Sequence, residues 1–152
     1  MTNNENTFSS LNELLETCRD GQNGFDTGAK AVNDPALQAE LMQYSMQRQD
    51  FAAELRAAIA ALGDRPKDGG STVAAVHRGW MNLKSMVGMN DRHSILAECE
   101  RGEDSALKAY RDAIHQGLPP VIMPIVQTQY EQIQRVHDRV RALRDAAKTE
   151  AA

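Results

Sequence analysis

Residues 98–104 read Glu98-Cys99-Glu100-Arg101-Gly102-Glu103-Asp104 and lie in the middle of a segment that predicts one long helix, from Asp91 to His115. The apolar residues of this segment recur in steps of three and four, as on one face of a helix: Leu96, Cys99, Ala106, Tyr110 and Ala113. Continuing this line between Cys99 and Ala106 reaches Glu103. We therefore expect the Glu103 carboxylate to occupy a core position halfway along the helix.

The first predicted helix covers residues 10–32. Ser10 followed by Glu13 matches a capping box in which Ser10 is the N-cap. Behind it, apolar residues and two glycines share one face, where a neighbouring helix could approach closely: Leu11, Leu14, Cys18, Gly21, Phe25, Gly28 and Val32. We expect residues 1–9 to form a short disordered lead.

The second predicted helix covers residues 35–62. Asp34-Pro35 combines an N-cap residue with a proline in the first turn, and Gly63 is a typical C-cap residue. Because so few residues separate this helix from the first, the two should form an antiparallel hairpin. Its apolar face contains one charged residue, Arg48, among Leu37, Leu41, Tyr44, Phe51, Leu55, Ala58 and Leu62.

The last predicted helix covers residues 120–145. Gly117 ends the helix before it, and Pro119-Pro120 forces a turn before Pro120 opens the new helix. Its apolar face contains one polar residue, Gln129, among Ile122, Val126, Ile133, Val136, Val140 and Leu143. We expect residues 146–152 to form a frayed tail.

The connection between residues 62 and 90 is far longer than a hairpin needs. It begins with a polar loop at residues 64–70, and a shorter helix capped by Ser71 or Thr72 is predicted to follow as far as Val87. Trp80 should clamp this crossover to the bundle. The sequence thus predicts an all-α fold: residues 10–145 form a ferritin-like four-helix bundle, with an additional short helix in the crossover between the second and third long helices.

Composition excludes several classes of partner. The net charge is −4, which argues against a surface for nucleic acid or anionic membranes. We expect a cytoplasmic protein, because the sequence contains no apolar run long enough for a membrane span and no export signal. Cys18 and Cys99 both fall on apolar helix faces, which favours reduced core thiols over a disulfide or a reactive thiol.

The polar residues on the helix faces should gather at one level of the bundle. Counting from the hairpin turns places Arg48, Glu103 and Gln129 near mid-bundle. A buried carboxylate needs a cation or a proton. Arg48 can supply the cation and Gln129 can complete the hydrogen bonding, which gives a structural polar layer. Alternatively, a metal ion could be bound by Glu100, Glu103 and His137.

The metal alternative predicts one ion rather than two. A carboxylate-bridged di-iron site takes Glu-x-x-His from two of its helices. Residues 35–62 contain no histidine, and residues 120–145 offer Gln134-x-x-His137, with glutamine in the carboxylate position. No cofactor is predicted apart from the iron, zinc or manganese ion that this alternative site would hold.

Four stretches of the chain resemble a family of bacterial four-helix-bundle proteins with a ferritin-like fold, classed as a domain of unknown function. They are residues 12–21, residues 77–80, His93 with residues 98–104, and residues 129–130 with 137–138. The resemblance extends over residues 11–144. It implies a bacterial cytoplasmic protein connected with stress or stationary phase, and metal binding by analogy with ferritins and rubrerythrins, but no established reaction.

Two functions follow from these observations. The first is a non-enzymatic bundle that acts through association or protective binding in stress. The second is a degenerate ferritin-like protein that binds metal through Glu100, Glu103 and His137. Thiol redox chemistry by Cys18 and Cys99 is a third, lesser hypothesis. If the chain forms a homo-oligomer, we expect a dimer.

Overall fold

The computed structural model describes the backbone of residues 3–64, 80, 82–88 and 91–151. Four long helices account for most of this part of the chain: α1 (Asn3–Ala31), α2 (Pro35–Ala61), α4 (Arg92–Gln116) and α5 (Met123–Ala151). A short 3₁₀ turn, η1 (Lys84–Met86), precedes α4, and the described residues contain no strand. Within these residues, no helix is both long enough and apolar enough to cross a membrane.

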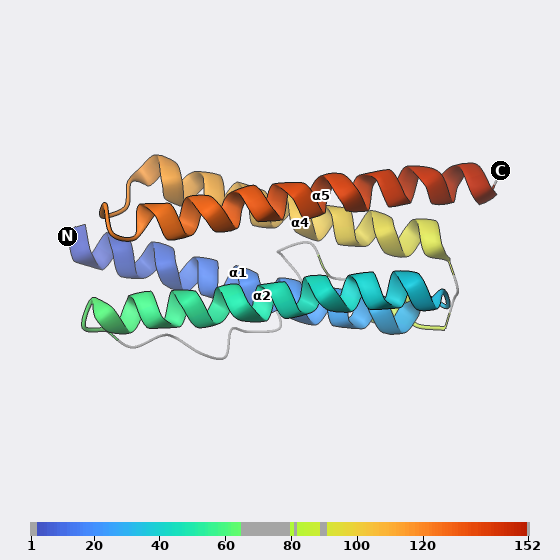
Figure 1. The fold of residues 1–152 in the computed structure, drawn as a ribbon, viewed down its shortest axis with the longest axis horizontal. Coiled ribbons are helices and arrows are strands. Elements are labelled where there is room, and N and C mark those ends of the chain that lie inside the picture. Colours follow the sequence, from blue (N-terminus) through green and yellow to red (C-terminus); the bar gives the residue numbers. More distant parts are fainter. Residues whose placement is uncertain (1–2, 65–79, 81, 89–90, 152) are drawn as a thin grey trace.

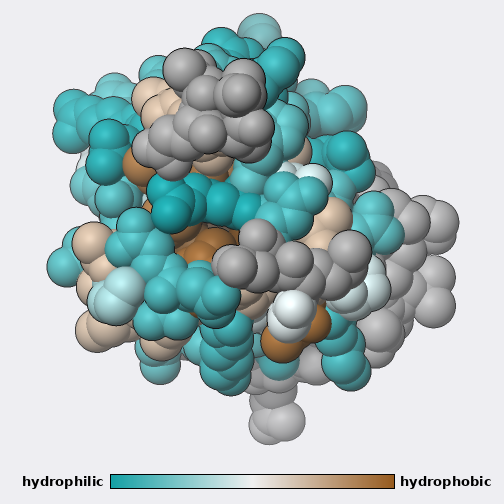
Figure 2. Space-filling model, turned by 90° about the vertical axis from the view of Figure 1, so that its right-hand side faces the viewer, coloured by the Kyte–Doolittle hydropathy of each residue, from teal (hydrophilic) through white to brown (hydrophobic). Residues whose placement is uncertain are grey.

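The helices form two antiparallel hairpins, α1 with α2 and α4 with α5 (Figure 1). Since α2 and α4 run in the same direction, the chain between them returns to the end of the bundle at which α2 began. The two hairpins meet chiefly along α1 and α4, while α2 and α5 make little contact. From the end where α1 turns into α2, the described part of the surface is mostly hydrophilic, with a few apolar side chains among the polar ones (Figure 2).

The hydrophobic core is divided in two. One cluster takes residues from the first half of α1 and of α5 and the second half of α2 and of α4, including Leu11, Leu14, Phe51, Leu55, Tyr110 and Ile133. The other takes residues from the opposite halves, including Phe25, Leu41, Ile95, Leu96, Val136 and Val140. Arg48 and Glu103, at the middle of α2 and α4, lie between the two clusters and belong to neither.

Most helix ends follow the local signals. The Asp34 side chain caps α2 by accepting a hydrogen bond from the Ala36 backbone N–H at 2.9 Å. Gly63 and Gly117 follow α2 and α4 with φ of +86° and +93°, backbone angles that a residue with a Cβ rarely adopts. Capping and termination at glycine depend only on neighbouring residues. The ends predicted from the sequence therefore agree with the observed helix ends to within a residue or two.

The start of α1 differs from the prediction. The helix begins at Asn3, so the proposed Ser10 N-cap is wrong, and most of residues 1–9 are helical rather than a disordered lead. Ser10 is buried inside the helix, and its hydroxyl donates to Gln116 Oε1 at the end of α4, at 2.9 Å. Thr7 is also buried. Packing against the rest of the bundle therefore extends the helix past a local start signal.

At the other terminus, α5 continues to Ala151, past the predicted end at residue 145.

The predicted crossover helix lies mostly outside the described residues, which resume at residue 80 and then at 82–88. In that part the chain forms only the 3₁₀ turn η1, and Val87 is extended with φ −61° and ψ 124°. The helix therefore does not continue to Val87 as predicted. Leu83 is buried in the core, and Trp80 packs against the same cluster, which is consistent with a clamp at this point.

Candidate functional site

The centre of the bundle holds a bidentate ion pair between α2 and α4. The Arg48 guanidinium donates from Nη1 to Glu103 Oε1 at 2.5 Å and from Nη2 to Oε2 at 2.6 Å. The two side chains are 1% and 0% exposed. Both carboxylate oxygens are therefore occupied, and neither charge faces solvent.

The surroundings of Arg48 hold it in this position. A Cβ at Gly21 on α1 would lie 3.1 Å from Arg48 Nη1, so the glycine leaves room for the guanidinium. The guanidinium carbon lies 5.2 Å from the centre of the Phe25 ring, a distance typical of a cation–π contact. Burial alone lowers the pKa of Arg48, but the Glu103 carboxylate outweighs this effect and raises it, so the group stays charged.

Gln129 belongs to a separate hydrogen-bond chain. The Tyr110 hydroxyl donates to Gln129 Oε1 at 2.6 Å, and Gln129 Nε2 donates to Glu54 Oε1 at 3.2 Å and to the Phe51 carbonyl at 3.4 Å. Cys18 Sγ lies 3.0 Å from the Tyr110 oxygen. Because the tyrosine proton is already used, the thiol must be the donor. The chain thus runs from a buried thiol to an exposed carboxylate on α2.

The two thiols are poorly suited to redox chemistry. Both are free cysteines and both are buried. Burial raises the pKa of Cys18 to about 11. Burial likewise raises the pKa of Cys99. A reactive cysteine needs an accessible thiolate, so neither thiol has the properties of a redox centre.

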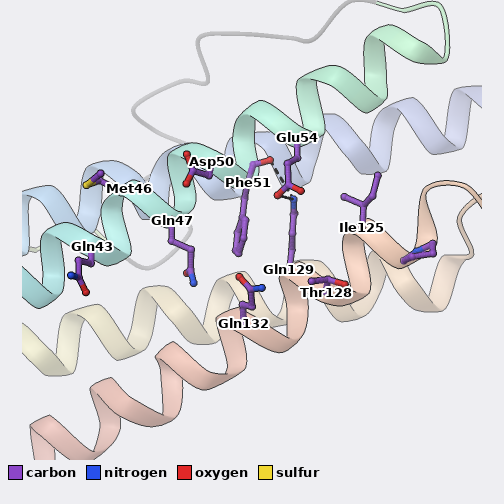
Figure 3. A pocket seen from close by; sticks show the side chains of 11 residues that line it. Gln43, Met46, Gln47, Asp50, Phe51, Glu54, Ile125, Thr128, Gln129 and Gln132 are labelled. Atoms are coloured by element: carbon purple, nitrogen blue, oxygen red, sulfur yellow. Dashed lines mark hydrogen bonds between the residues drawn. The ribbon is translucent and has the colours of Figure 1, made fainter.

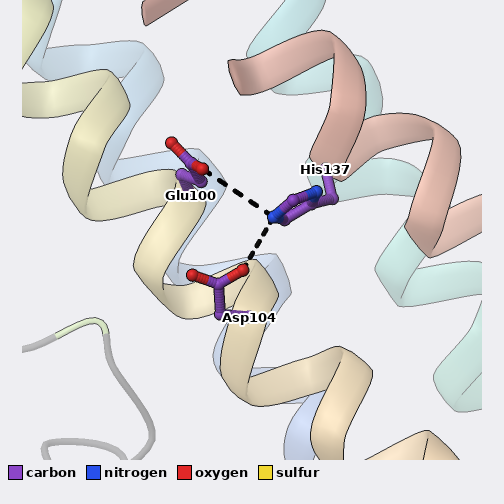
Figure 4. Close-up of side chains that lie close together, drawn as sticks. All are labelled: Glu100, Asp104 and His137. Atoms are coloured by element: carbon purple, nitrogen blue, oxygen red, sulfur yellow. Dashed lines mark hydrogen bonds and ion pairs between the residues drawn. The ribbon is translucent and has the colours of Figure 1, made fainter.

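A second polar cluster lies between α4 and α5 and consists of Glu100, Asp104 and His137 (Figure 4). One ligand atom from each residue lies within 4.8 Å of the others. His137 Nε2 is 2.7 Å from Asp104 Oδ1 and 3.9 Å from Glu100 Oε2. Of the predicted metal ligands, the structure brings Glu100 and His137 together, but Glu103 is bound by Arg48. Asp104 takes the third position.

The Asp138 carboxylate orients the ring of His137. Its Nδ1 lies 3.1 Å from Asp138 Oδ1, and that carboxylate also accepts from Gln134 Nε2 at 3.0 Å. The hydrogen bond from His137 lowers the pKa of Asp138. Asp138 accepts the Nδ1 proton, and Nε2 faces Asp104 and Glu100, so Nε2 is the ring atom placed to contact a metal ion, as is usual for a metal-binding histidine.

Two arginines from α5 compete for the same cluster. Arg141 Nε donates to Glu100 Oε2 at 3.2 Å, and Arg144 Nη1 donates to Glu100 Oε1. Glu100 is only 5% exposed. A metal ion bound here would have to displace at least part of this pairing, because guanidinium groups and a cation would occupy the same carboxylate oxygens.

Residues 6–116 match a known family, described as Domain of unknown function (DUF2383). The chain belongs to this family. The matched region of the DUF2383 domain contains Arg48, Glu103, Glu100 and Asp104, whereas Gln129 and His137 lie beyond it on α5. No curated protein matches the chain.

Proposed function

We propose that this DUF2383 chain is a non-enzymatic helical bundle that acts by association with another molecule, and that the Arg48–Glu103 pair is a structural part of it. The observation that carries the proposal is the complete mutual pairing of these two charges at 1% and 0% exposure. Groups that are fully paired and closed to solvent offer a substrate nothing to bind.

The ferritin-like assignment is part of this proposal. It is supported by the two antiparallel hairpins and by the parallel course of α2 and α4, which together match bundles with one long crossover. A bacterial origin, a cytoplasmic location and a link to stress rest on the resemblance of residues 11–144 to the bacterial four-helix-bundle family.

Stability measurements test the structural role of the pair. In Glu103→Gln the Arg48 charge is left unpaired, and breaking a buried pair typically costs about 3–5 kcal/mol of unfolding free energy. The double variant Arg48→Met/Glu103→Leu removes both charges and should recover most of this loss. Lys108→Met is the control, because its ion pair with Asp112 is exposed and should contribute less than about 1 kcal/mol. Wild-type stability of Glu103→Gln in urea unfolding would contradict a structural role.

Metal binding is the second candidate function, and the cluster of Glu100, Asp104 and His137 favours it. Two carboxylates and one imidazole suit iron, zinc or manganese. The Asp138 carboxylate behind the histidine supports this assignment. The Glu100 contacts with Arg141 and Arg144 oppose it.

Metal analysis of protein purified without a histidine tag distinguishes the two candidates. If the site is real, titration with Zn²⁺ or Mn²⁺ should show one ion per chain, and His137→Gln should abolish binding, whereas His115→Gln, an exposed histidine on α4, should not. Arg144→Met should strengthen binding, because it removes a competing cation. If His137→Gln and the wild type bind metal equally, or neither binds it, this cluster is a network of ion pairs only.

A further inference from the structure

A groove runs between α2 and α5, the two helices that make little contact. It contains two neighbouring cavities of about 660 and 550 Å³, which share Glu54 and Ile125 among their lining residues. In Figure 3, Gln47 and Phe51 of α2 and Gln129 of α5, which line the larger one, extend into the space between the two helices. Together the cavities extend along α2 from Gln43 to Ala61 and reach Leu62 just after it.

The groove has a defined end and a partly apolar surface. One turn before Gln43, an ion pair between Glu40 and Arg139 joins α2 to α5, with Arg139 Nε 2.8 Å from Glu40 Oε2. Met46 and Val121, which line the groove toward its opposite ends, are 60% and 73% exposed. These two side chains give both ends of the groove apolar surface that a bound partner would remove from water.

The charges lining the groove have one sign. Asp50 and Glu54 are the charged residues among those that line the two cavities, and both are exposed. The neutral lining residues are apolar or carry amide or hydroxyl groups, as Gln47 and Thr128 do. Acidic side chains on the α2 side of the groove attract a partner with basic residues.

The same charges disfavour a second copy of the chain as the occupant. In a two-fold dimer the same surface patch lies on both sides of the interface. Two such grooves would bring the Asp50 and Glu54 carboxylates of both copies into one interface, and both copies carry a net charge of −4.

We propose that this groove binds an amphipathic helix of a different protein, with apolar residues on one face and lysine or arginine beside them. The proposal rests on the proposed function, because it names the class of partner with which the bundle associates. The groove spans about 19 residues of α2, or roughly 28 Å at 1.5 Å per residue, which a single helix of similar length can follow. A helix whose apolar face lies in a groove is a common mode of peptide recognition. The smaller cavity supplies apolar lining residues for such a face, among them Ala57, Ala61 and Val121.

Peptide binding tests the proposal. The probe is a labelled synthetic helix of alanine and leucine with lysines beside its apolar face, and its binding is followed by fluorescence anisotropy. Ala57→Lys places a long cationic side chain in the groove, whereas Ala53→Lys makes the same change at an exposed position of α2 that lines neither cavity. We expect Ala57→Lys to weaken binding at least about tenfold and Ala53→Lys less than about twofold, because only the lysine at position 57 would occupy the groove.

A second pair of measurements tests the charge of the partner. The same peptide with glutamate in place of lysine should bind at least about tenfold more weakly, and Asp50→Asn should reduce both the affinity for the lysine peptide and its salt dependence. Circular dichroism and urea unfolding establish that each variant is folded.

Three results would overturn the proposal: no binding of the lysine peptide, equal loss of binding in Ala57→Lys and Ala53→Lys, or a wild-type dimer in sedimentation that Ala57→Lys dissociates. The last would identify a second copy as the occupant. None of these results affects the stability test of Arg48 and Glu103. The proposal that the groove binds a helix can therefore fail without the failure of the proposed function.

Discussion

Cys18 shows how far burial controls the chemistry of single residues in this bundle. Its thiol lies in the core 3.0 Å from the Tyr110 oxygen, and burial raises its pKa to about 11 from an ordinary value of 9.0. The folded chain thus keeps the thiol proton at a pH where the unfolded chain loses it. The same burial that makes the residue inert as a nucleophile makes the fold sensitive to alkali.

The expected consequence is a loss of stability between pH 9 and 11. Below pH 9 the thiol is protonated in both states, so its contribution is complete. As pH rises from there the unfolded state releases the proton first, and the unfolding free energy falls. Two pKa units correspond to roughly 2–3 kcal/mol. Urea unfolding at several pH values measures this slope, which should be shallower in Cys18→Ala. The same slope in both proteins would show that Cys18 does not cause the loss.

Some site residues could be predicted from the sequence and others could not. Arg48 and Glu103 interrupt apolar helix faces, so their burial follows from helical periodicity. Gln129 interrupts a face in the same way, but its partners Tyr110 and Glu54 depend on how each helix is rotated, which periodicity does not specify. Asp104 lies off the apolar face and is exposed. The only feature of the sequence that points to Asp104 as a member of the cluster is its position four residues after Glu100.

At the level of helices, glycines control how closely α1 and α4 approach the crossover. Trp80 lies against Gly24 of α1 and Gly102 of α4. A Cβ at either glycine would come within 2.1 Å of the indole ring. Phe25 packs against the same ring, with centroids 5.1 Å apart and a T-shaped arrangement. The two glycines therefore form the slot that receives the tryptophan.

Gly102→Ala should displace Trp80. Replacing glycine by alanine inside a helix ordinarily stabilises it by roughly 0.5–1 kcal/mol. Here the methyl group overlaps the ring, and overpacking typically costs about 1–3 kcal/mol. Because Trp80 is the single tryptophan, its fluorescence reports the change directly and should shift to the red. The comparison variant is Gly28→Ala, whose Cβ meets Cys99 Sγ at 3.2 Å, a contact that a small shift relieves. Greater stability with unchanged fluorescence in Gly102→Ala would show that the slot has room.

Some helix ends are determined by neighbouring residues in the chain, and others by contacts with distant residues. Asp34-Pro35 and Gly117 act through their own backbone and neighbouring residues, and their positions were predicted. Ser10 has the local pattern of an N-cap, yet α1 passes through it because Ser10 contacts Gln116 on another helix. A contact between residues so far apart in the chain has no local signature. The groove between α2 and α5 also depends on the arrangement of whole helices and was missed for the same reason.

In the whole molecule, α2 belongs to one hairpin, and ion pairs of different kinds join it to the other. Arg48 contacts Glu103 of α4 in the core, whereas Glu40 contacts Arg139 of α5 at the surface. The Tyr44 hydroxyl also donates to Glu40, and the hydrogen bond from Arg139 is the main cause of the lowered pKa of Glu40. Both pairs join the hairpins, but only the first is closed to water.

The burial of each ion pair should determine how much that pair contributes to the free energy of unfolding. Arg139→Met removes a partly exposed pair, so we expect a loss of less than about 1 kcal/mol of unfolding free energy. Arg48→Met leaves Glu103 unpaired in the core and should cost about 3–5 kcal/mol. Hydrogen exchange adds a second readout. In Arg139→Met, faster exchange should be confined to the parts of α2 and α5 near Glu40, whereas Arg48→Met should accelerate exchange throughout all four helices. A loss in Arg139→Met as large as that in Arg48→Met would mean that the surface pair, rather than the buried one, holds the two hairpins together.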